Sequence, residues 1–251
     1  MTDAELAAAV AEQAGRLLLD LREHGTPDGE ELGAAGDRIA NRFVRDALRR
    51  ARPNDAFLSE EDPDSLCRLD NARCWIIDPL DGTREYAEGR DDWAVHVALT
   101  LDRTPAIGAV SLPAQDLVLR SDRPRRIDGM RSPPRIVVSR TRPPRAAAAV
   151  AQALGAEVAA MGSAGAKAMA VVRGQADIYL HSGGQHEWDN CAPVAVALAA
   201  GLHATRLDGT RLLYNGKDTA VPDLLICRNE WAKPVMACLA ALDCGRSARV
   251  A

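Results

Sequence analysis

The acidic residues of this 251-residue sequence include three motifs whose carboxylates could bind hard divalent cations. The first motif is Ser-Glu-Glu-Asp at residues 59–62, the second is Asp-Pro-Leu-Asp-Gly-Thr at 78–83, and the third is Glu-Trp-Asp at 187–189. Three separate acidic motifs at the ends of strands or helices are hard to explain as unrelated caps and turns. Their conjunction therefore predicts that carboxylates distant in the sequence meet around bound cations.

The middle motif carries the most specific chemistry. Asp78 and Asp81 stand three residues apart at the end of a predicted strand, so a turn restrained by Pro79 would let both reach one cation. Gly82 lets the backbone approach a ligand, and Thr83 adds a hydroxyl group. If a helix begins after this motif, the unpaired N–H groups of Gly82 and Thr83 would bind an anion. Carboxylates for cations beside N–H groups for an anion indicate a site for Mg²⁺ and phosphate.

Each motif also has a simpler structural interpretation. Asp-Gly is a common hairpin turn, so residues 78–83 alone fit a turn or a cap equally well. Asp189 precedes a long apolar helical stretch and, taken alone, fits a helix N-cap better than a metal ligand. Glu60, Glu61 and Asp62 in isolation would form a solvated acidic loop. Only the conjunction of the three motifs favours the metal site.

The elements expected to position these motifs begin with an α+β half. Apolar residues at spacings of three and four predict helices at residues 3–23 and 37–50, with a Gly-rich loop or hairpin at 25–36 between them. Short buried runs and alternation of apolar residues predict several strands. These strands are expected at residues 75–77, 93–101, 107–110 and 117–119.

A Pro- and Arg-rich segment at residues 122–134 predicts a domain boundary, with one domain at 1–131 and a second at 132–251 that completes the cleft. Beyond the boundary, strands and helices alternate, which indicates an α/β C-terminal half. The expected elements are a strand at 136–139, helices at 145–154 and 167–173, a strand at 177–180, and helices at 190–200 and 233–242.

Composition excludes several classes of protein. The chain carries 35 acidic and 31 basic side chains, a formal charge of −4 that gives no support to nucleic-acid binding. The sequence has no apolar run long enough to span a bilayer, and its first residues are acidic where a signal peptide needs basic ones. The six cysteines form no C-x-x-C pair and fit free thiols in a reducing compartment. We therefore expect a soluble cytoplasmic protein with no membrane partner.

Four motifs resemble, in the same order, those of the inositol monophosphatase superfamily of Mg²⁺-dependent, Li⁺-sensitive phosphatases. They are Ser-Glu-Glu-Asp, Trp-Ile-Ile-Asp-Pro-Leu-Asp-Gly-Thr, Gly-Ser-Ala-Gly-Ala-Lys and Glu-Trp-Asp-Asn-Cys-Ala-Pro. Within the superfamily, Asp-Gly-Thr-Arg-Glu-Tyr at 81–86 and Ser-Arg-Thr at 139–141 are most similar to the 3′(2′),5′-bisphosphate nucleotidases of the CysQ group. The resemblance covers residues 37–201 and implies a layered α-β-α-β-α sugar-phosphatase fold.

The resemblance implies hydrolysis of the 3′-phosphate of adenosine 3′,5′-bisphosphate (PAP) to AMP and phosphate. It also implies 3′-phosphoadenylyl sulfate as a second substrate, a role in sulfate assimilation, two or three Mg²⁺ ions per site, and a homodimer. The alternatives are an inositol-1-phosphate or fructose-1,6-bisphosphate phosphatase, an enzyme of broad specificity, and a sensor of Mg²⁺ and phosphate ligands without turnover.

The resemblance also implies a role for individual residues, with Asp78 bridging two cations. The implied metal ligands are Glu60, Asp78, the carbonyl of Leu80, Asp81 and Asp189. The implied catalytic residues, which orient the attacking water, are Asp37, Glu60 and Thr83. The implied substrate-binding residues are Glu60, Asp81, Gly82, Thr83, Ser139, Arg140, Lys167 and Asp189. Arg84, Arg140 and Lys167 are the candidates for a second phosphate of the substrate. The sequence departs from the nucleotidases at Arg142, where the related Ser-Arg-Ser-His segment has His.

Overall fold

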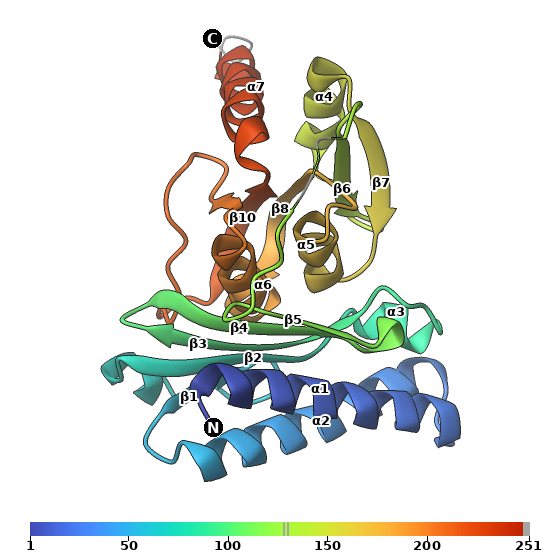
Figure 1. The fold of residues 1–251 in the computed structure, drawn as a ribbon, viewed down its shortest axis with the longest axis vertical. Coiled ribbons are helices and arrows are strands. Elements are labelled where there is room, and N and C mark those ends of the chain that lie inside the picture. Colours follow the sequence, from blue (N-terminus) through green and yellow to red (C-terminus); the bar gives the residue numbers. More distant parts are fainter. Residues whose placement is uncertain (128, 130, 248–251) are drawn as a thin grey trace.

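Two five-stranded sheets form the frame of the molecule in the computed structural model, which describes residues 1–127, 129 and 131–247 (Figure 1). The first sheet contains, in spatial order, β1 (Ala56–Ser59), β2 (Arg73–Asp81), β3 (Ala94–Leu101), β4 (Thr104–Leu112) and β5 (Leu117–Arg120). The second contains β7 (Glu157–Met161), β6 (Arg135–Ser139), β8 (Ile178–His186), β10 (Ala220–Cys227) and β9 (His203–Thr205).

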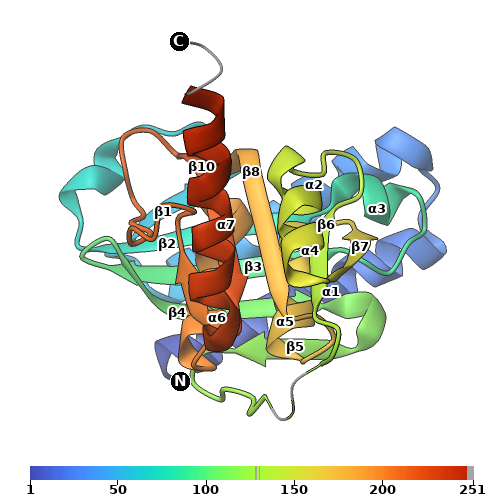
Figure 2. The same cartoon turned by 90° about the horizontal axis from the view of Figure 1, so that it is seen from above.

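Three pairs of helices alternate with the two sheets. Helices α1 (Asp3–His24) and α2 (Gly29–Ala51) cover the outer face of the first sheet, and α5 (Ala164–Val172) and α6 (Glu187–Ala199) lie between the sheets (Figures 1 and 2). Helices α4 (Arg145–Leu154) and α7 (Asn229–Ser247) cover the outer face of the second sheet. The short helix α3 (Thr83–Ala87) follows β2. The predicted α-β-α-β-α order of layers is confirmed.

The alternation in β3 shows how the sequence selects these layers. Val95, Val97 and Leu99 pack in the apolar core under α1 and α2. Ala94 and Ala98, which point to the other face, belong to the core shared with α5 and α6. Small side chains on this second face allow the middle helices to approach the sheet closely.

Helix α2 begins earlier than the sequence predicted, because part of the Gly-rich segment at 25–36 is helical. Glycine costs about 1 kcal/mol relative to alanine in a helix, so the segment resembles a loop. Close packing explains its helical state. A Cβ atom on Gly33 would lie 2.8 Å from Cγ2 of Thr83, and one on Gly36 would lie 3.0 Å from a methyl group of Leu80.

Strand β2 continues through the middle acidic motif, where the sequence predicted a turn. Asp78 pairs with His96 of β3 and Asp81 pairs with Ala94, so two residues of β2 lie opposite one residue of β3. Residues three apart in a regular strand point to opposite faces. This bulge, which includes Pro79, therefore turns Asp78 and Asp81 toward the same face of the sheet.

The two sheets fall on either side of the predicted boundary segment at 122–134, of which residues 128 and 130 lie outside the described part of the chain. Helix α6 packs against β2, β3 and β4 of the first sheet and against β8, β9 and β10 of the second. The division into domains at 1–131 and 132–251 therefore stays a prediction. In the described residues, each helix is too short or too polar to cross a membrane.

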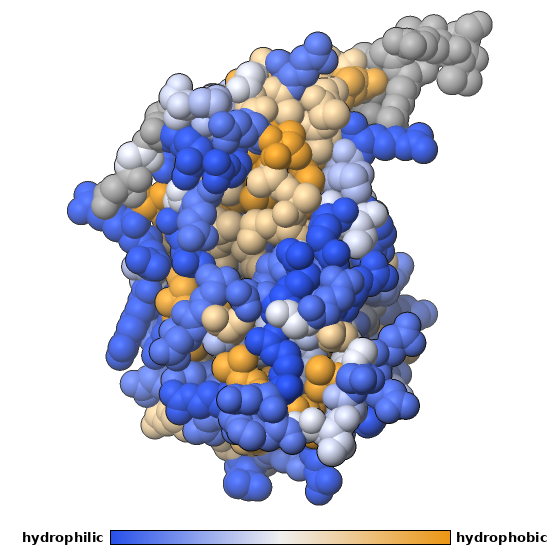
Figure 3. Space-filling view, turned by 90° about the vertical axis from the view of Figure 1, so that its right-hand side faces the viewer, coloured by the Kyte–Doolittle hydropathy of each residue, from blue (hydrophilic) through white to orange (hydrophobic). Residues whose placement is uncertain are grey.

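One outer edge of the second sheet is exposed and apolar. β7 pairs only with β6 among the described strands, and Val158 at its centre is 51% exposed. The neighbouring helix α4 exposes Ala148 and Ala153. Seen from the side of α4 and β7, apolar surface gathers over the upper part of the molecule, whereas hydrophilic surface dominates below (Figure 3).

Candidate active site

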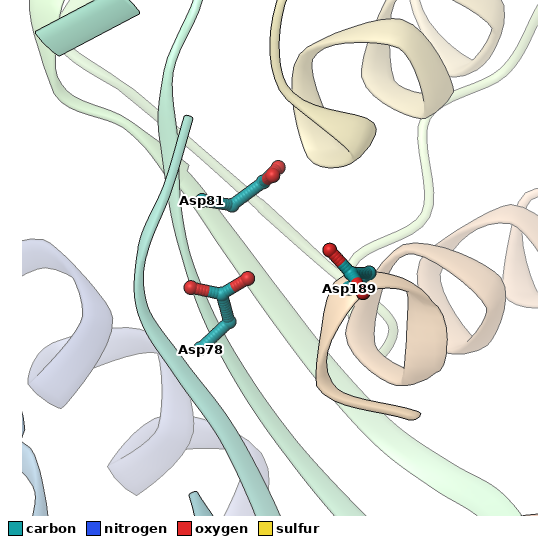
Figure 4. Close-up of side chains that lie close together, drawn as sticks. All are labelled: Asp78, Asp81 and Asp189. Atoms are coloured by element: carbon teal, nitrogen blue, oxygen red, sulfur yellow. The ribbon is translucent and has the colours of Figure 1, made fainter. Parts of the chain in front are cut away.

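Three aspartates from two acidic motifs meet at the boundary between the layers (Figure 4). Asp78 and Asp81 come from β2, and Asp189 comes from the first turn of α6. One carboxylate oxygen from each lies within 4.8 Å of the other two. Asp78 is 1% exposed and Asp81 is 6% exposed, so this acidic cluster is largely shielded from water.

The N-terminus of α5 holds the carboxylate of Asp81 in place. The backbone N–H groups of Ala164 and Gly165 donate to it at 3.0 and 2.6 Å, and the Ser163 hydroxyl also donates. Nε2 of His96 lies 3.2 Å from the same carboxylate. The Gly-Ser-Ala-Gly motif thus opens a helix beside the cleft, and it also orients a predicted metal ligand.

Asp189 is fixed by the start of its own helix. Its carboxylate accepts a hydrogen bond from the backbone N–H of His186 at 2.6 Å, so it caps α6 while pointing into the acidic cluster. The adjacent Glu187 is buried and accepts bonds from the backbone N–H groups of Asn215 and Gly216 at 2.6 and 2.8 Å. The predicted N-cap position of Asp189 is wrong, because His186 is the N-cap and Asp189 is the third residue of α6. Asp189 still takes part in capping through its bond to His186, and this role is compatible with a metal site.

Helix α2 places Asp37 beside the same site. The hydroxyl of Thr83, the first residue of α3, lies 3.5 Å from Oδ1 of Asp37 and 3.1 Å from the carbonyl oxygen of Leu80. Gly82 precedes it with a φ of +92°, and a Cβ at this position would lie 3.2 Å from Cβ of Ser163. Glycine is required here because both the positive φ and the close approach disfavour a side chain.

Glu60 lies on the loop after β1, where its backbone N–H donates to the Ile77 carbonyl at 3.3 Å. The loop is anchored to α2 on both sides of the two glutamates. Asn41 accepts a hydrogen bond from Ser59 at 2.8 Å and donates one to Asp62 at 2.9 Å. Ser59 and Asp62 are therefore anchors of the acidic loop, and Glu60 and Glu61 are the residues it presents.

The crowding of carboxylates shifts their pKa values in opposite directions. Burial raises the pKa of Asp78 well above its usual range, and the charges of Glu60 and Asp81 add to this effect. Burial also raises the pKa of Asp189 to about 6 and that of Asp37 to about 7.

Glu60 and Asp81 complete this electrostatic pattern. Desolvation, reinforced by the charge of Asp189, raises the pKa of Glu60 to about 8. Burial acts in the same direction on Asp81, but His96, Ser163 and Lys167 outweigh it and lower its pKa to about 2. The site therefore contains more negative charge than its own basic groups neutralise.

These donors fit a hard divalent cation. Every member of the acidic cluster is a carboxylate oxygen donor, which suits Mg²⁺, Mn²⁺ or Ca²⁺ better than softer metals. Asp78 is buried, and the hydrogen bond that it accepts comes from the backbone N–H of Leu80 at 3.1 Å. A buried carboxylate with so little compensation is costly unless a cation binds it.

Six of the eight predicted substrate-binding residues line a cavity of about 610 Å³, and Glu60 and Arg140 are not among its lining residues. Asp81, Gly82, Thr83, Ser139, Lys167 and Asp189 all line it. Lys167 is 4% exposed and donates to the carbonyls of Gly162 and Ser163, and burial lowers its pKa to about 8. Arg140 differs from the others, because its guanidinium is paired with Glu85 at 2.9 Å and Glu88 at 2.8 Å.

Sequence reasoning did not identify His96, which contacts both β2 and α6, the two elements that carry the acidic cluster. Its Nδ1 lies 3.1 Å from the Trp188 carbonyl, and its Nε2 faces Asp81. The signal was present in the strand pattern. His96 stands between Ala94 and Ala98 on a face otherwise made of small apolar residues, and it is completely buried there.

A five-layer fold that gathers aspartates from two distant motifs at one cleft offers a site suited to divalent cations. The Inositol monophosphatase family matches residues 2–241 of this chain, and the chain belongs to that family. A 3′-phosphoadenosine 5′-phosphate phosphatase from Mycobacterium leprae is 50% identical over 247 residues, which are 92% of this chain and 91% of the relative. The 3′(2′),5′-bisphosphate nucleotidase CysQ of Escherichia coli K12 is 30% identical over 197 residues, covering 74% of this chain and 80% of CysQ.

Solved structures agree on the fold. CysQ from Bacteroides thetaiotaomicron has a TM-score of 0.79 at 23% identity, covering 90% of this chain and 97% of that structure. An inositol monophosphatase from Anabaena (Nostoc) sp. PCC 7120 has a TM-score of 0.77 at 24% identity and covers 95% of each chain. The family resemblance inferred from the motifs is confirmed.

Proposed function

We propose that this protein is a Mg²⁺-dependent phosphatase that hydrolyses the 3′-phosphate of PAP to AMP and phosphate, and that it also accepts 3′-phosphoadenylyl sulfate. The main support is that Asp81 and Asp189 of the acidic cluster lie in the wall of a cavity that Gly82, Thr83 and Lys167 also line. The relatives at 50% identity carry the name of this activity. A role in sulfate assimilation follows from the same proposal.

In this proposal, Glu60, Asp78, the Leu80 carbonyl, Asp81 and Asp189 would hold two or three Mg²⁺ ions. When bound, such ions lower the pKa of water and stabilise negative charge on the leaving oxygen. Li⁺ would inhibit by taking one of their positions. The all-oxygen donor set and the excess of carboxylates support this assignment.

The protein's own groups then bind the substrate and orient the attacking water. Gly82 and Thr83 bind the scissile phosphate, and Thr83, Asp37 and Glu60 orient the water. Oδ1 of Asp37 faces the Thr83 hydroxyl at 3.5 Å and is placed to receive a proton from this water. The water oxygen bonds to phosphorus as the bond between phosphorus and the 3′-oxygen breaks, and the leaving oxygen takes a proton.

We further propose a cytoplasmic homodimer. The five cysteines whose side chains the structure describes are all unpaired, which supports a reducing compartment. The exposed edge of β7 with the alanines of α4 offers an apolar surface that a second copy would cover.

A phosphate-release panel tests the proposed activity. Wild-type protein is mixed with PAP, inositol-1-phosphate and fructose-1,6-bisphosphate at increasing Mg²⁺. We expect the highest kcat/KM for PAP and no release without Mg²⁺. Equal or better turnover of inositol phosphate contradicts the substrate assignment, and binding without any phosphate release indicates a sensor.

The variant Asp78→Asn tests the metal site directly. It removes a central anion with little change in shape, so we expect nearly all turnover to be lost. The Tm without metal should stay the same or rise, because a buried, poorly compensated carboxylate has been removed. Asp122→Asn, which breaks a surface pair with Arg120, is the control and should keep full activity. Full activity of Asp78→Asn would contradict the metal site.

A further inference from the structure

The cations around the cavity are not equally available to a substrate. Arg84, Arg142 and Lys167 line the cavity, and Arg140 lies in the same loop as Arg142, between β6 and α4. A substrate with two phosphates needs a cation for the phosphate that is not transferred, in addition to the groups that act on the scissile one. The structure allows these candidates to be compared by their existing partners.

Two of the candidates already have partners. Arg140 is bound by both Glu85 and Glu88, so a phosphate would have to displace two carboxylates. Lys167 is buried, donates to two backbone carbonyls, and its charge acts on Asp81, which places it at the metal end of the cavity. Lys167 is therefore suited to the scissile phosphate rather than to the second one.

Arg142 differs from both. Arg142 is exposed, and within the described residues its guanidinium makes no ion pair and no hydrogen bond. Only its backbone N–H is bonded among these residues, to Oγ of Ser139 at 3.2 Å. Its guanidinium lies over Gly184, where Nη1 would be 2.9 Å from a Cβ at that position. The φ of Gly184, +72°, favours glycine at this position. Because glycine has no side chain, the guanidinium of Arg142 has room in the cavity wall.

The other cavity-lining residues near Arg142 carry no charge at neutral pH. Thr141, His181 and Gln185 line the same cavity with Gly184. Burial lowers the pKa of His181 to about 4, so this histidine is neutral at pH 7 and contributes no charge. Arg142 is therefore the cation that this part of the cavity presents to a ligand. A guanidinium suits this task because it can bind a phosphate through two parallel hydrogen bonds.

We propose that Arg142 binds the second, non-transferred phosphate of a bisphosphorylated substrate and so makes the enzyme prefer bisphosphates to monophosphates. This inference rests on the proposed phosphatase function. It replaces the three candidates that the sequence suggested. Arg140 is paired with carboxylates, Lys167 lies at the metal end, and Arg84 directly follows Thr83, which is assigned to the scissile phosphate. Arg142 has no carboxylate partner in the described chain.

The test compares Arg142→Ala and Arg142→Lys with wild type on PAP and on 3′-AMP, which lacks the 5′-phosphate. We expect Arg142→Ala to raise KM for PAP about 10- to 100-fold, the usual range for a lost hydrogen bond to a charged group, with KM for 3′-AMP unchanged. Arg142→Lys should lose less affinity than Arg142→Ala, because lysine keeps the charge but cannot form two parallel hydrogen bonds. Arg145→Ala is the matched control, since Arg145 is exposed three residues later and does not line the cavity.

A binding measurement separates this inference from the proposed activity. Calorimetry with 5′-AMP and with adenosine requires no turnover, and Arg142→Ala should weaken only 5′-AMP. Equal losses for PAP and 3′-AMP, an unchanged KM for PAP, or 5′-AMP binding that is undetectable or unaffected by Arg142→Ala would each overturn the role of Arg142. Failure of wild type to release phosphate from PAP would instead overturn the proposed function.

Discussion

At the scale of single residues, the site stores unfavourable electrostatic energy in the absence of cations. Burial and neighbouring carboxylates raise the pKa values of Asp37, Glu60, Asp78 and Asp189. His96, Ser163 and Lys167 lower the pKa of Asp81 and keep it ionised. Protons and divalent cations therefore compete for the same oxygen atoms. Metal affinity should fall as pH is lowered, because metal ligands must be deprotonated.

This competition predicts how the stability of the metal-free protein depends on pH. Asp37 has a folded-state pKa of about 7, above the value near 4 of the unfolded chain. Between pH 6.5 and 8 the folded state therefore holds protons that the unfolded state has lost. The free energy of unfolding should fall as pH rises through this window. Urea denaturation in the presence of EDTA measures it.

The choice of window limits three opposing contributions, from His181, His203 and Lys167. His181, with a pKa lowered to about 4, makes stability rise with pH below about 6.5, and Lys167, with a pKa lowered to about 8, does so above 8. Asp37→Asn should reduce the slope, and saturating Mg²⁺ should abolish the decline. A metal-free stability that increases from pH 6.5 to 8 would contradict the raised pKa of Asp37.

At the scale of elements, helix α2 does more than cover the sheet. Its glycines let it approach α3 closely, its Asp37 reaches Thr83, and its Asn41 holds the loop that carries Glu60. Sequence patterns predicted its C-terminal half because the apolar stripe there is regular. They did not predict its start at Gly29, because helix propensity is local and the packing that favours this start comes from α3 and β2.

The anchoring role of Asn41 predicts a linked loss of stability and metal affinity. Asn41→Ala leaves the Ser59 hydroxyl and the Asp62 carboxylate without this partner, which should lower the free energy of unfolding by about 1–3 kcal/mol. The looser loop should raise the Mg²⁺ concentration for half-maximal activity about 10-fold, as for groups that orient metal ligands. Denaturation and Mg²⁺ titration measure the two effects.

The matched control on the same helix is Arg42→Ala. The Arg42 side chain is 83% exposed, so both quantities should stay at wild-type values. If Asn41→Ala lowers stability but leaves the Mg²⁺ titration unchanged, the loop does not depend on this anchor to present Glu60.

At the scale of the whole molecule, the sequence predicted the layers and the acidic motifs but not all the contacts between them. The strand at 93–101 could be predicted because its alternation is local, and the three motifs could be recognised because their residue types indicate ligand chemistry. The pairing of Arg140 with Glu85 and the contact of His96 with Asp81 arise only when distant segments pack. The bulge in β2 was misread as a turn because its register is set by β3.

The proposed homodimer is also a property of the whole molecule, and the edge strand β7 is its candidate interface. An edge strand presents unpaired backbone groups as well as side chains, and Val158 is half exposed at its centre. Sedimentation velocity should show a dimer for wild type and a monomer for Val158→Lys, because a buried lysine without a partner would oppose association. Leu198→Lys is the control, since Leu198 is 45% exposed near the end of α6. A monomeric wild type contradicts the homodimer, and a dimer broken only by Leu198→Lys places the interface on another face.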